Sequence, residues 1–254
     1  MTAPLVLSAS SIQTFLRCGR QWYYAYVPEY RMPPSVRQTI GIAAHGAIEV
    51  NMHQKVVVGT DLPAADVLDA FSTQYDTLVA EVEDPEEDIA KAKDSGIALV
   101  DLHHRDVAPN IQPILVEQPI QFEVNGVPYS GVVDLVDDRG QVRDWKTTSR
   151  RPQPGAYLLN MVGYAIGYRE QTGETESDVV LDYLVRTKQP QYIPIKSGGP
   201  VSDDAIVRFA DVVTDVAAAI QAGNFVPNGL TNGACSWCGY KSICKAYQLQ
   251  NAMV

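Results

Sequence analysis

Apolar residues recur along this chain with two different periods, and the change of period outlines the fold. Helical spacing of three to four residues predicts helices over six segments, at about 10–18, 39–54, 64–82, 85–104, 156–171 and 203–222. Alternation, or short runs rich in β-branched residues, predicts strands at about 114–124, 127–136, 141–146, 179–186 and 192–195. Helices that flank a small mixed sheet are typical of the α/β class, which we therefore expect.

Short turns join the first three predicted strands. Asn125-Gly126 is a dipeptide that favours a two-residue hairpin, and residues 138–140, Asp-Arg-Gly, form a second turn. These strands are therefore expected to form a meander. Near the N-terminus, Ser10 and Gln13 match the capping box that begins a helix.

The length of 254 residues allows one sizeable core. We expect a single domain over residues 1–254, and its parts follow one another along the chain. N-terminal helices occupy 1–60 and an acidic helical segment occupies 61–112. The sheet core fills 113–200, and a final helix with clustered cysteines ends the chain over 201–254.

The charge of the chain is unevenly distributed. The formal net charge is −10, but residues 61–137 alone hold 17 acids and 3 bases, a balance of −14. The rest of the chain therefore carries +4, and a solvated helical face explains the acidic segment. The net charge neither supports nor excludes a nucleic-acid partner.

The N-terminal residues MTAPLVLSASS lack a basic segment followed by an apolar stretch, so no signal peptide is expected. No run of eighteen apolar residues suggests a membrane span. The expected location is the cytoplasm, with no membrane partner. Disulfides are rare there, and clustered cysteines more often bind metal.

The four cysteines form one pattern. Cys18 stands alone near the start, whereas Cys235, Cys238 and Cys244 follow the spacing C-x2-C-x5-C. Two thiolates two residues apart can hold one metal centre, and the other two complete a four-sulfur set that joins both ends of the chain. Four unrelated buried thiols would be scattered. Spacing alone leaves zinc and an iron–sulfur cluster both open, because tetrahedral sulfur suits either.

Acidic and basic side chains converge in the meander. Asp144 and Lys146 are two residues apart on the third strand and so point to the same face, which a hairpin partner brings close to Asp134. Two carboxylates and an amine suit phosphodiester hydrolysis with Mg²⁺ or Mn²⁺. The alternative is that both acids merely flank the surface turn at 138–140.

This arrangement resembles the PD-(D/E)XK nuclease superfamily, and more narrowly its RecB-type branch. The branch carries its acids and lysine as G-x-x-D followed by D-x-K, matched by Gly131, Asp134, Asp144 and Lys146. The resemblance implies a restriction-endonuclease-like core in which Asp134, Asp144 and Lys146 are catalytic.

An upstream helical histidine completes the resemblance. The branch places it in a G-x-x-x-H setting, which Gly41 and His45 match. The resemblance implies that His45, Asp134, Asp144 and the backbone carbonyl of Trp145 bind Mg²⁺ or Mn²⁺. His45 shares a predicted helix face with Ile48, Glu49 and Met52. His53, His103 and His104 have no such support, and we expect them at the surface.

A subset of the branch bears a [4Fe-4S] cluster held by one early and three late cysteines, as in AddB-type recombination subunits and the nucleases of CRISPR adaptation. Cys18, Cys235, Cys238 and Cys244 match that order, and LSASSIQTFLRCGRQWYYAYV resembles the opening segment. The resemblance implies a structural [4Fe-4S] cluster that clamps the two ends of the chain. Most aromatic residues of the WYYAY run are expected to pack around the cluster or core rather than stack on bases.

The chain departs from the branch at one point. The branch commonly follows its lysine with a helix that bears Gln and, four residues later, Tyr. Tyr164 fits, but Asn160 stands where Gln is expected, and Gln153 lies in a proline-flanked loop before the helix. Glu117, on the first strand, is a further acid that could approach the metals.

Together these features predict a metal-dependent DNA nuclease, and more narrowly an exonuclease, in recombination, repair or replication. Its expected partners are single-stranded DNA or duplex ends, with a helicase or recombination protein supplying them. The second hypothesis is a non-catalytic DNA-end-binding module that keeps the nuclease shell. An intact set of Asp134, Asp144 and Lys146 argues against it.

Overall fold

The structure is a computed structural model that describes residues 4–27, 30, 32–83, 85–152 and 158–251. A five-stranded mixed sheet runs through it in the order β1-β2-β3-β4-β5. Its strands are β1 (Pro113–Val124), β2 (Val127–Asp137), β3 (Gln141–Thr148), β4 (Asp178–Val185) and β5 (Gln191–Lys196). β2 and β3 pair antiparallel, β3 and β4 parallel, and β4 and β5 antiparallel. The predicted mixed sheet and meander are confirmed.

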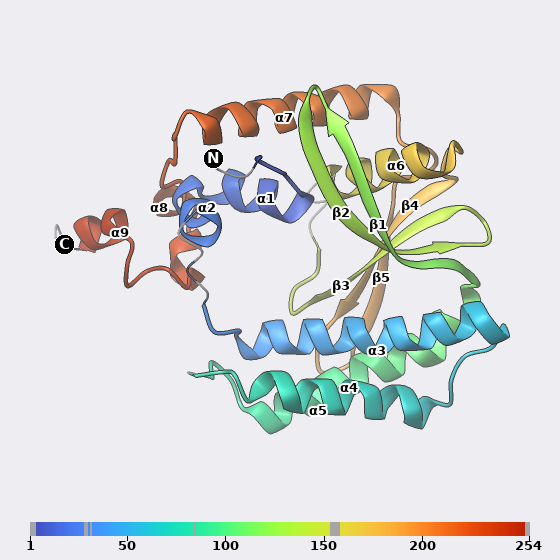
Figure 1. The fold of residues 1–254 in the computed structure, drawn as a ribbon. Helices are drawn as coiled ribbons and strands as arrows, with labels where there is room; N and C mark the ends of the chain where they lie inside the picture. The colour runs from blue at the N-terminus through green and yellow to red at the C-terminus, as the bar shows by residue number, and fades with distance from the viewer. Residues whose placement is uncertain (1–3, 28–29, 31, 84, 153–157, 252–254) are drawn as a thin grey trace. The chain divides into compact units, whose positions relative to one another are not determined.

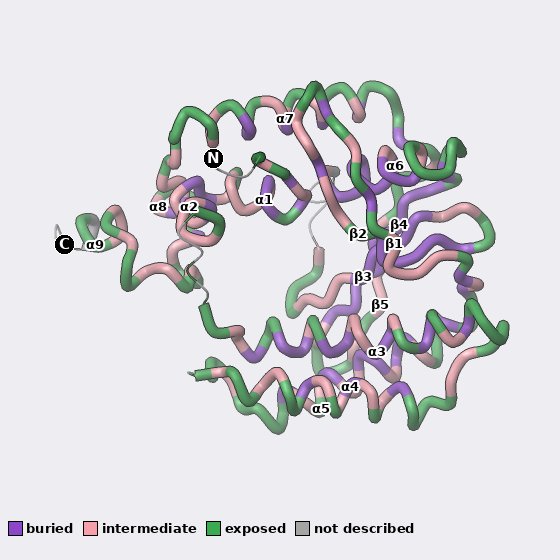
Figure 2. Tube along the Cα trace, viewed as in Figure 1, coloured by how far each residue is buried: buried purple, intermediate pink, exposed green. Residues whose placement is uncertain are grey.

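Three helices form a layer on one face of the sheet (Figure 1): α3 (Val36–Val58), α4 (Ala64–Val79) and α5 (Ile89–Leu102). A capping box of Ser35 and Gln38 starts α3, and Gly59 ends it with a left-handed φ of 79°. Their buried residues pack against Leu135, Trp145 and Leu184 of the sheet. This core lies along the inner side of α3 (Figure 2).

The opposite face of the sheet is covered by α6 (Leu158–Thr172), which follows residues outside the described ranges. Gly167 lets this helix approach β1, because a Cβ there would lie 2.5 Å from the Ile120 side chain. β3 is therefore buried on both sides, since its alternate residues face α3 and α6.

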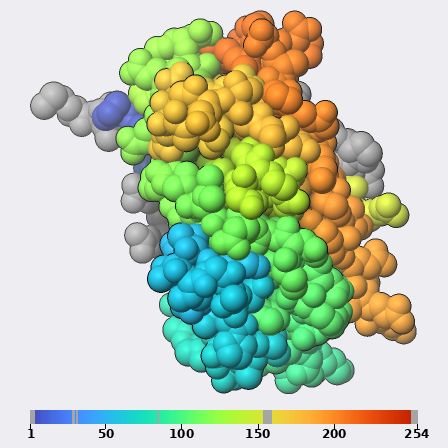
Figure 3. All heavy atoms as spheres, turned by 90° about the vertical axis from the view of Figure 1, so that its right-hand side faces the viewer, coloured from blue at the N-terminus to red at the C-terminus, as the bar shows by residue number. Residues whose placement is uncertain are grey.

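An irregular helical segment links α5 to the sheet, consisting of the π-helix η1 (His103–Val107) and the 3-10 helix η2 (Ala108–Asn110). The end of α3, in blue, lies beside this green segment and the yellow-green turn near residue 140 in Figure 3. Lys55 of α3 anchors the junction by donating to the Ala108 carbonyl at 2.7 Å and to Asp61 at 2.8 Å.

The N- and C-terminal elements are α1 (Ala9–Arg17), α2 (Gly19–Tyr26), α7 (Asp203–Gln221), α8 (Gly229–Asn232), η3 (Ala234–Trp237) and α9 (Lys245–Asn251). The N-cap of α1 is Ser8, which accepts from the Ser11 amide, so the prediction that Ser10 caps this helix is wrong. The Ser8 side chain reaches the third residue of the helix, which is the geometry that capping requires.

The chain divides into two compact units. The first, called here the cysteine unit, comprises residues 1–32, 121–131 and 203–254, and the second, the sheet unit, comprises 33–120 and 132–202. All four cysteines fall in the cysteine unit, and all predicted catalytic residues fall in the sheet unit. Across the described ranges, no helix combines the length and apolar character needed to cross a membrane.

Candidate active site

The site is built where β2 and β3 separate. The ladder pairs Leu135 with Arg143, and one step further the register would set Asp134 opposite Asp144. At this point the Trp145 amide donates its hydrogen bond to the Asp134 side chain, with 2.7 Å between the amide nitrogen and Oδ2. Asp134 is therefore fixed in place by the strand that carries the second predicted acid.

His45 reaches this point from α3. Its Nε2 lies 2.9 Å from Oδ2 of Asp134, while Ile48 and Met52 of the same helix are buried in the core. The hydrogen bond to Asp134 raises the pKa of His45 to about 8, against the lowering effect of burial. His45, Ile48 and Met52 therefore share one helix face, as predicted, and His45 is the polar residue among them that reaches the site.

Glu117 of β1 lies beside His45 and has an unusual backbone conformation for a strand residue. Its φ of 51° is left-handed, which costs a residue with a side chain on the order of 1 kcal/mol or more. Such a positive φ within a strand re-aims the side chain, as bulges beside active sites do. Glu117 Oε1 lies 3.5 Å from Nε2 of His45, and it is buried without a hydrogen-bond partner among the described residues. Burial, followed by the charge of Asp134, raises the pKa of Glu117.

Three potential ligand atoms thus converge. Within the described ranges, His45, Glu117 and Asp134 are the one set of three histidine, cysteine or acidic residues whose ligand atoms all lie within 4.8 Å of one another. One imidazole nitrogen and two carboxylates are donors that suit Mg²⁺ or Mn²⁺. Sequence reasoning put His45 and Asp134 in this set but left Glu117 a marginal candidate, because the strand pattern carries no sign of its positive φ.

Asp144 and Lys146 lie on the α6 face of β3, as their spacing predicts. The Lys146 ammonium donates to Asp144 Oδ1 at 2.8 Å and lies 2.6 Å from Oδ2, but it makes no well-aligned hydrogen bond to Oδ2. Burial, then the charge of Asp134, raises the pKa of Asp144 to about 6. Burial alone would lower the pKa of Lys146, but these two carboxylates outweigh it and raise that pKa.

Tyr164 of α6 contacts Asp144, and Asn160 of the same helix contacts Tyr164. The Tyr164 hydroxyl donates to Asp144 Oδ1 at 2.6 Å. Burial, followed by the charge of Asp144, raises the pKa of Tyr164, whereas a side-chain hydrogen bond from Asn160 works in the opposite direction. The shorter amide at position 160 is thus one step removed from Asp144 and is connected to it through Tyr164.

Trp145 lies between Asp144 and Lys146 on the chain, with its ring in the core on the α3 face. The ring meets His103 edge-on, with centroids 4.6 Å apart. His103 is 1 % exposed, so its predicted surface position is wrong. The π-helical turn of η1 directs this side chain into the core, and no periodic pattern signals that turn. His104 is partly buried against the Leu62 carbonyl, and His53 is exposed.

In the cysteine unit all four cysteines line one small cavity. A Cβ on Gly229 would lie 3.1 Å from the sulfur of Cys235 and 3.5 Å from that of Cys18, so this glycine makes room for both. Among the described residues, however, no three cysteine sulfurs lie within 4.8 Å of one another. The structure brings the thiols to one place but shows no metal cluster.

The aromatic run packs as predicted. Trp22 is buried and stacks on Tyr26 and Phe225, at centroid distances of 5.2 and 5.8 Å, and its Nε1 donates to the Ser11 hydroxyl. Tyr24 stacks on Tyr240 of the cysteine-rich segment at 5.8 Å. These rings are part of the internal packing of the cysteine unit.

Comparison with known proteins identifies what the chain resembles. The sequence profile described as the PD-(D/E)XK nuclease superfamily matches residues 6–245. A protein from Eubacterium rectale, provisionally described as an exonuclease, has a crystal structure that aligns with a TM-score of 0.60 and 11 % identity, over 89 % of this chain and 86 % of that one. This identity is low enough that the likeness shows the fold alone.

A second solved structure, that of SSO0001, is 14 % identical over 94 % of this chain and 95 % of that chain, with a TM-score of 0.35. This score is too low to support an argument. No curated protein matches the chain significantly in sequence.

Proposed function

The chain belongs to the PD-(D/E)XK nuclease superfamily, and from that premise we propose that it is a metal-dependent deoxyribonuclease. The observation that carries the proposal is the convergence of His45, Glu117 and Asp134 within 4.8 Å, joined through Trp145 to Asp144 and Lys146. The proposed metal ligands are His45, Asp134 and Asp144, with the Trp145 carbonyl and, in addition, Glu117.

The donor set fits a divalent ion. Glu117 Oε1 and Asp144 Oδ2 are buried acceptors without a hydrogen bond among the described residues, and buried carboxylate oxygens normally have partners. An ion held by His45, Glu117 and Asp134 would give Glu117 Oε1 a partner. Asp144 lies outside that 4.8 Å set, and its Oδ2 has the Lys146 ammonium 2.6 Å away. When bound, Mg²⁺ or Mn²⁺ supplies Lewis-acid polarisation of the phosphate and lowers the pKa of a water.

Lys146 acts as a cation in this proposal. Its raised pKa keeps the ammonium charged at neutral pH, so it donates rather than accepts a proton. It can orient the attacking water and offset negative charge that develops on the phosphate in the transition state. Tyr164, held by Asn160, keeps Asp144 Oδ1 in place.

We extend the proposal to exonuclease action on DNA ends or single strands, within recombination, repair or replication. The Eubacterium rectale protein's description as an exonuclease supports this extension, and a helicase or recombination partner would supply the substrate. A non-catalytic DNA-end-binding module is the alternative. The hydrogen bond from Asn160 to Tyr164 weakens its main motivation, because the amide retains a role beside the site.

We also propose that Cys18, Cys235, Cys238 and Cys244 hold a structural [4Fe-4S] cluster, as in one branch of the superfamily. The proposal rests on that likeness and on the one small cavity that all four cysteines line. The visible spectrum and metal content of anaerobically purified protein test this. Broad visible absorbance with iron supports it, and colourless zinc protein contradicts it.

The nuclease proposal is tested with end-labelled single- and double-stranded DNA, in Mn²⁺ and in EDTA. Wild-type protein should cleave in Mn²⁺ alone. Asp144→Ala and Lys146→Ala should each lower the rate by about 10³-fold or more, because the first removes a proposed metal ligand and the second removes the cation that offsets negative charge in the transition state. Circular dichroism checks that the variants remain folded.

The matched controls are Asp138→Ala in the exposed turn after β2 and Lys188→Ala in the loop after β4, both on the sheet unit. Each removes the same charge without touching the site and should leave the rate unchanged. Full activity in both site variants would refute the assignment, and DNA binding without cleavage by wild type would favour the non-catalytic module.

A further inference from the structure

A second polar pocket lies in the sheet unit, beside the candidate active site. Its volume is about 220 Å³, and it is lined by Arg37 of α3, Arg186 after β4 and the Thr-Thr-Ser run at 147–149. Ile40 and Leu99, both buried, form its apolar part. Two guanidinium groups and a set of hydroxyls around one hollow are the donors with which proteins bind phosphate.

The carboxylate of Glu87, which is not among the residues that line the pocket, already contacts both of its arginines. Arg186 holds Glu87 with two hydrogen bonds of 2.8 and 2.9 Å, whereas Arg37 Nε lies 3.5 Å from the same carboxylate. The Arg186 side chain is 15 % exposed and that of Arg37 is 62 % exposed. Arg186 is therefore fixed, and Arg37 is loosely held and able to turn to another anion.

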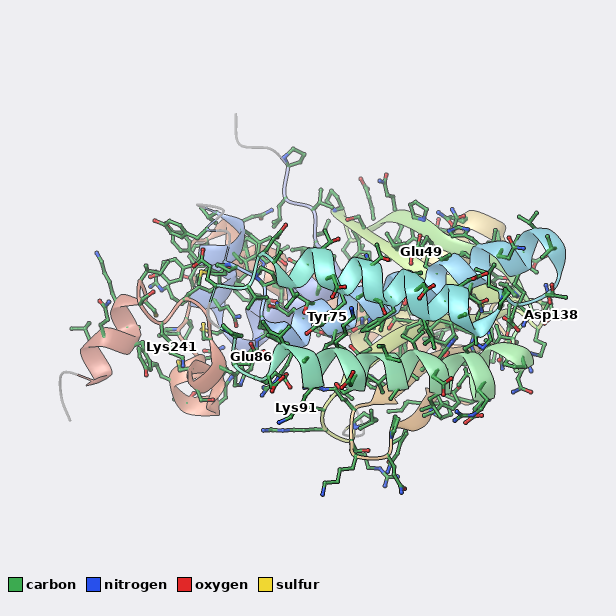
Figure 4. All side chains as sticks on the ribbon, turned by 90° about the horizontal axis from the view of Figure 1, so that it is seen from below. Glu49, Tyr75, Glu86, Lys91, Asp138 and Lys241 are labelled. Atoms are coloured by element: carbon green, nitrogen blue, oxygen red, sulfur yellow. The ribbon has the colours of Figure 1, made fainter. Side chains whose placement is uncertain are left out.

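Glu87 belongs to the loop between α4 and α5. The carboxylate of its neighbour Glu86 accepts hydrogen bonds from the backbone amides of Val36 and Arg37, at the start of α3, both with N···O distances of 3.1 Å. Figure 4 labels Glu86 at the beginning of α5. Two adjacent carboxylates of this loop thus occupy donors that a phosphate would also use.

The pocket and the active site share two elements. β3 carries Asp144 and Lys146 into the site, and its last two residues, Thr147 and Thr148, line the pocket together with Ser149, which follows the strand. α3 carries Arg37 into the pocket and His45 into the site, about 12 Å further along the helix at 1.5 Å per residue. Between them, Gly41 lets α3 approach β3, because a Cβ there would lie 2.9 Å from Thr147 Oγ1.

The hydroxyls of the pocket are partly uncommitted. Thr148 Oγ1 is engaged with the backbone of Arg150. For Thr147 and Ser149, the described part of the chain contains no side-chain hydrogen bond, and both residues line the pocket. Arg150 and Arg151 follow and are exposed, so positive charge continues from the pocket along this edge.

We propose that this pocket binds a phosphate group of the DNA strand a few nucleotides from the bond that is cut. Arg37 and the hydroxyls of Thr147 and Ser149 contact the phosphate, Arg186 supplies a fixed positive charge, and Glu87 competes for Arg37. The inference rests on the proposed nuclease function, because it takes the strand through the active site as its ligand. It assigns a positioning role to Arg37, which lies outside the catalytic group.

The test is DNA binding by the full chain in EDTA, which prevents cleavage. The probes are a single-stranded oligonucleotide with a 5′-phosphate, the same strand with a 5′-hydroxyl, and a circular single strand. Arg37→Gln should weaken binding by roughly tenfold and reduce the slope of log affinity against log salt by about 1. Glu87→Gln, which removes the competing charge, should strengthen binding several-fold.

The control is Arg105→Gln. Arg105 is held by two acids, as Arg37 is held by one, and its side chain is 59 % exposed, but it does not line the pocket. It should change neither affinity nor salt slope. Loss confined to the phosphorylated strand identifies the ligand as a terminal phosphate, and equal loss on all three probes identifies an internal one.

Unchanged DNA affinity and salt slope in Arg37→Gln would refute the proposal that the pocket binds a DNA phosphate. If Glu87→Gln binds no more tightly than wild type, the competition by Glu87 is overturned. Failure of the nuclease proposal looks different, because wild-type protein would then cut no DNA in Mn²⁺ whatever the binding data show.

Discussion

The acidic site of the sheet unit and the cysteine cavity of the cysteine unit are both candidate metal centres, but they are prepared in different ways. His45, Glu117 and Asp134 already converge within 4.8 Å. The four thiols line one cavity, yet no three of the described sulfurs come that close. Asp134 is held by the Trp145 amide and by His45, whereas in the cavity the thiol of Cys238 has a backbone hydrogen bond from Tyr240.

The difference follows from the chemistry of the ligands. Carboxylates and imidazole form strong, charge-assisted hydrogen bonds to the protein itself, so their geometry is preorganised. Thiols are weak donors and acceptors, and burial, then the neighbouring cysteines, raises the pKa of Cys235. In the proposal made above, it is the metal cluster that fixes the positions of the four sulfurs. The acidic site should therefore be stable without metal, and the cysteine site should not.

The largest expected effect is loss of the proposed cluster. Cys235→Ser should lower the free energy of unfolding by more than about 3 kcal/mol, because the binding energy of a structural metal centre is folding energy. Activity should fall as a consequence of the lost stability. Urea denaturation followed by circular dichroism measures the change, and EDTA at the acidic site should leave the unfolding midpoint nearly unaltered.

Ser236→Ala is the matched control, since it is adjacent in sequence and alters no sulfur ligand. A colourless Cys235→Ser protein with wild-type stability and activity would remove the distinction between the two sites.

Acid should destabilise the sheet unit through His103. Burial, then the nearby charge of Arg143, lowers the pKa of His103 to about 3, below the value of about 6.5 in unfolded chains. Between these two pH values the unfolded chain binds a proton that the folded chain excludes. Stability is therefore present above pH 6.5 and falls by about 1.4 kcal/mol for each unit of pH lost below it, as far as pH 3.

His103→Phe removes this titration and should flatten that part of the stability curve. His53→Phe, at an exposed position of α3, should leave the acid dependence as in wild type. Lys55, His104 and Asp61 also act electrostatically on His103, so the difference between the two variants is the quantity to compare. Parallel curves for His103→Phe and wild type would contradict the buried, neutral imidazole.

The smallest expected effect lies at Glu117, where preorganisation carries a cost in strain. Asn tolerates a left-handed φ better than Glu does, and Glu117→Asn also removes a buried carboxylate oxygen that has no partner in the described part of the chain. We expect the free energy of unfolding of the variant to be about 1 kcal/mol higher than that of wild type, and its nuclease activity to be lost. Gln118→Asn, the next residue, is the control. A destabilised Glu117→Asn protein would mean that the carboxylate supports the fold rather than the chemistry.

Local spacing predicted which side chains of the candidate site lie close together. A strand places residues two apart on one face, so Asp144 and Lys146 meet, and a helix places His45 on the face of Ile48 and Met52. The strand boundaries and both turns were equally readable, because alternation and Asn-Gly or Asp-Arg-Gly turns are local signals. The single-domain organisation stays a prediction.

Other features could not be read locally. Glu117 depends on a positive φ inside a strand, and His103 on a π-helical turn, and neither has a periodic signature. The N-cap was misplaced by two residues, because serines occupy several adjacent positions and only the geometry selects Ser8.

The sequence by itself determined the order of elements and the residue types of both metal-binding candidates, since periodicity and motif spacing are properties of neighbouring residues. Only the tertiary structure decided which acids converge, how Glu87 occupies the arginines of the second pocket, and how far apart the cysteine sulfurs lie. Those distances depend on backbone torsions and helix packing between residues far apart in the chain, and no local pattern encodes them.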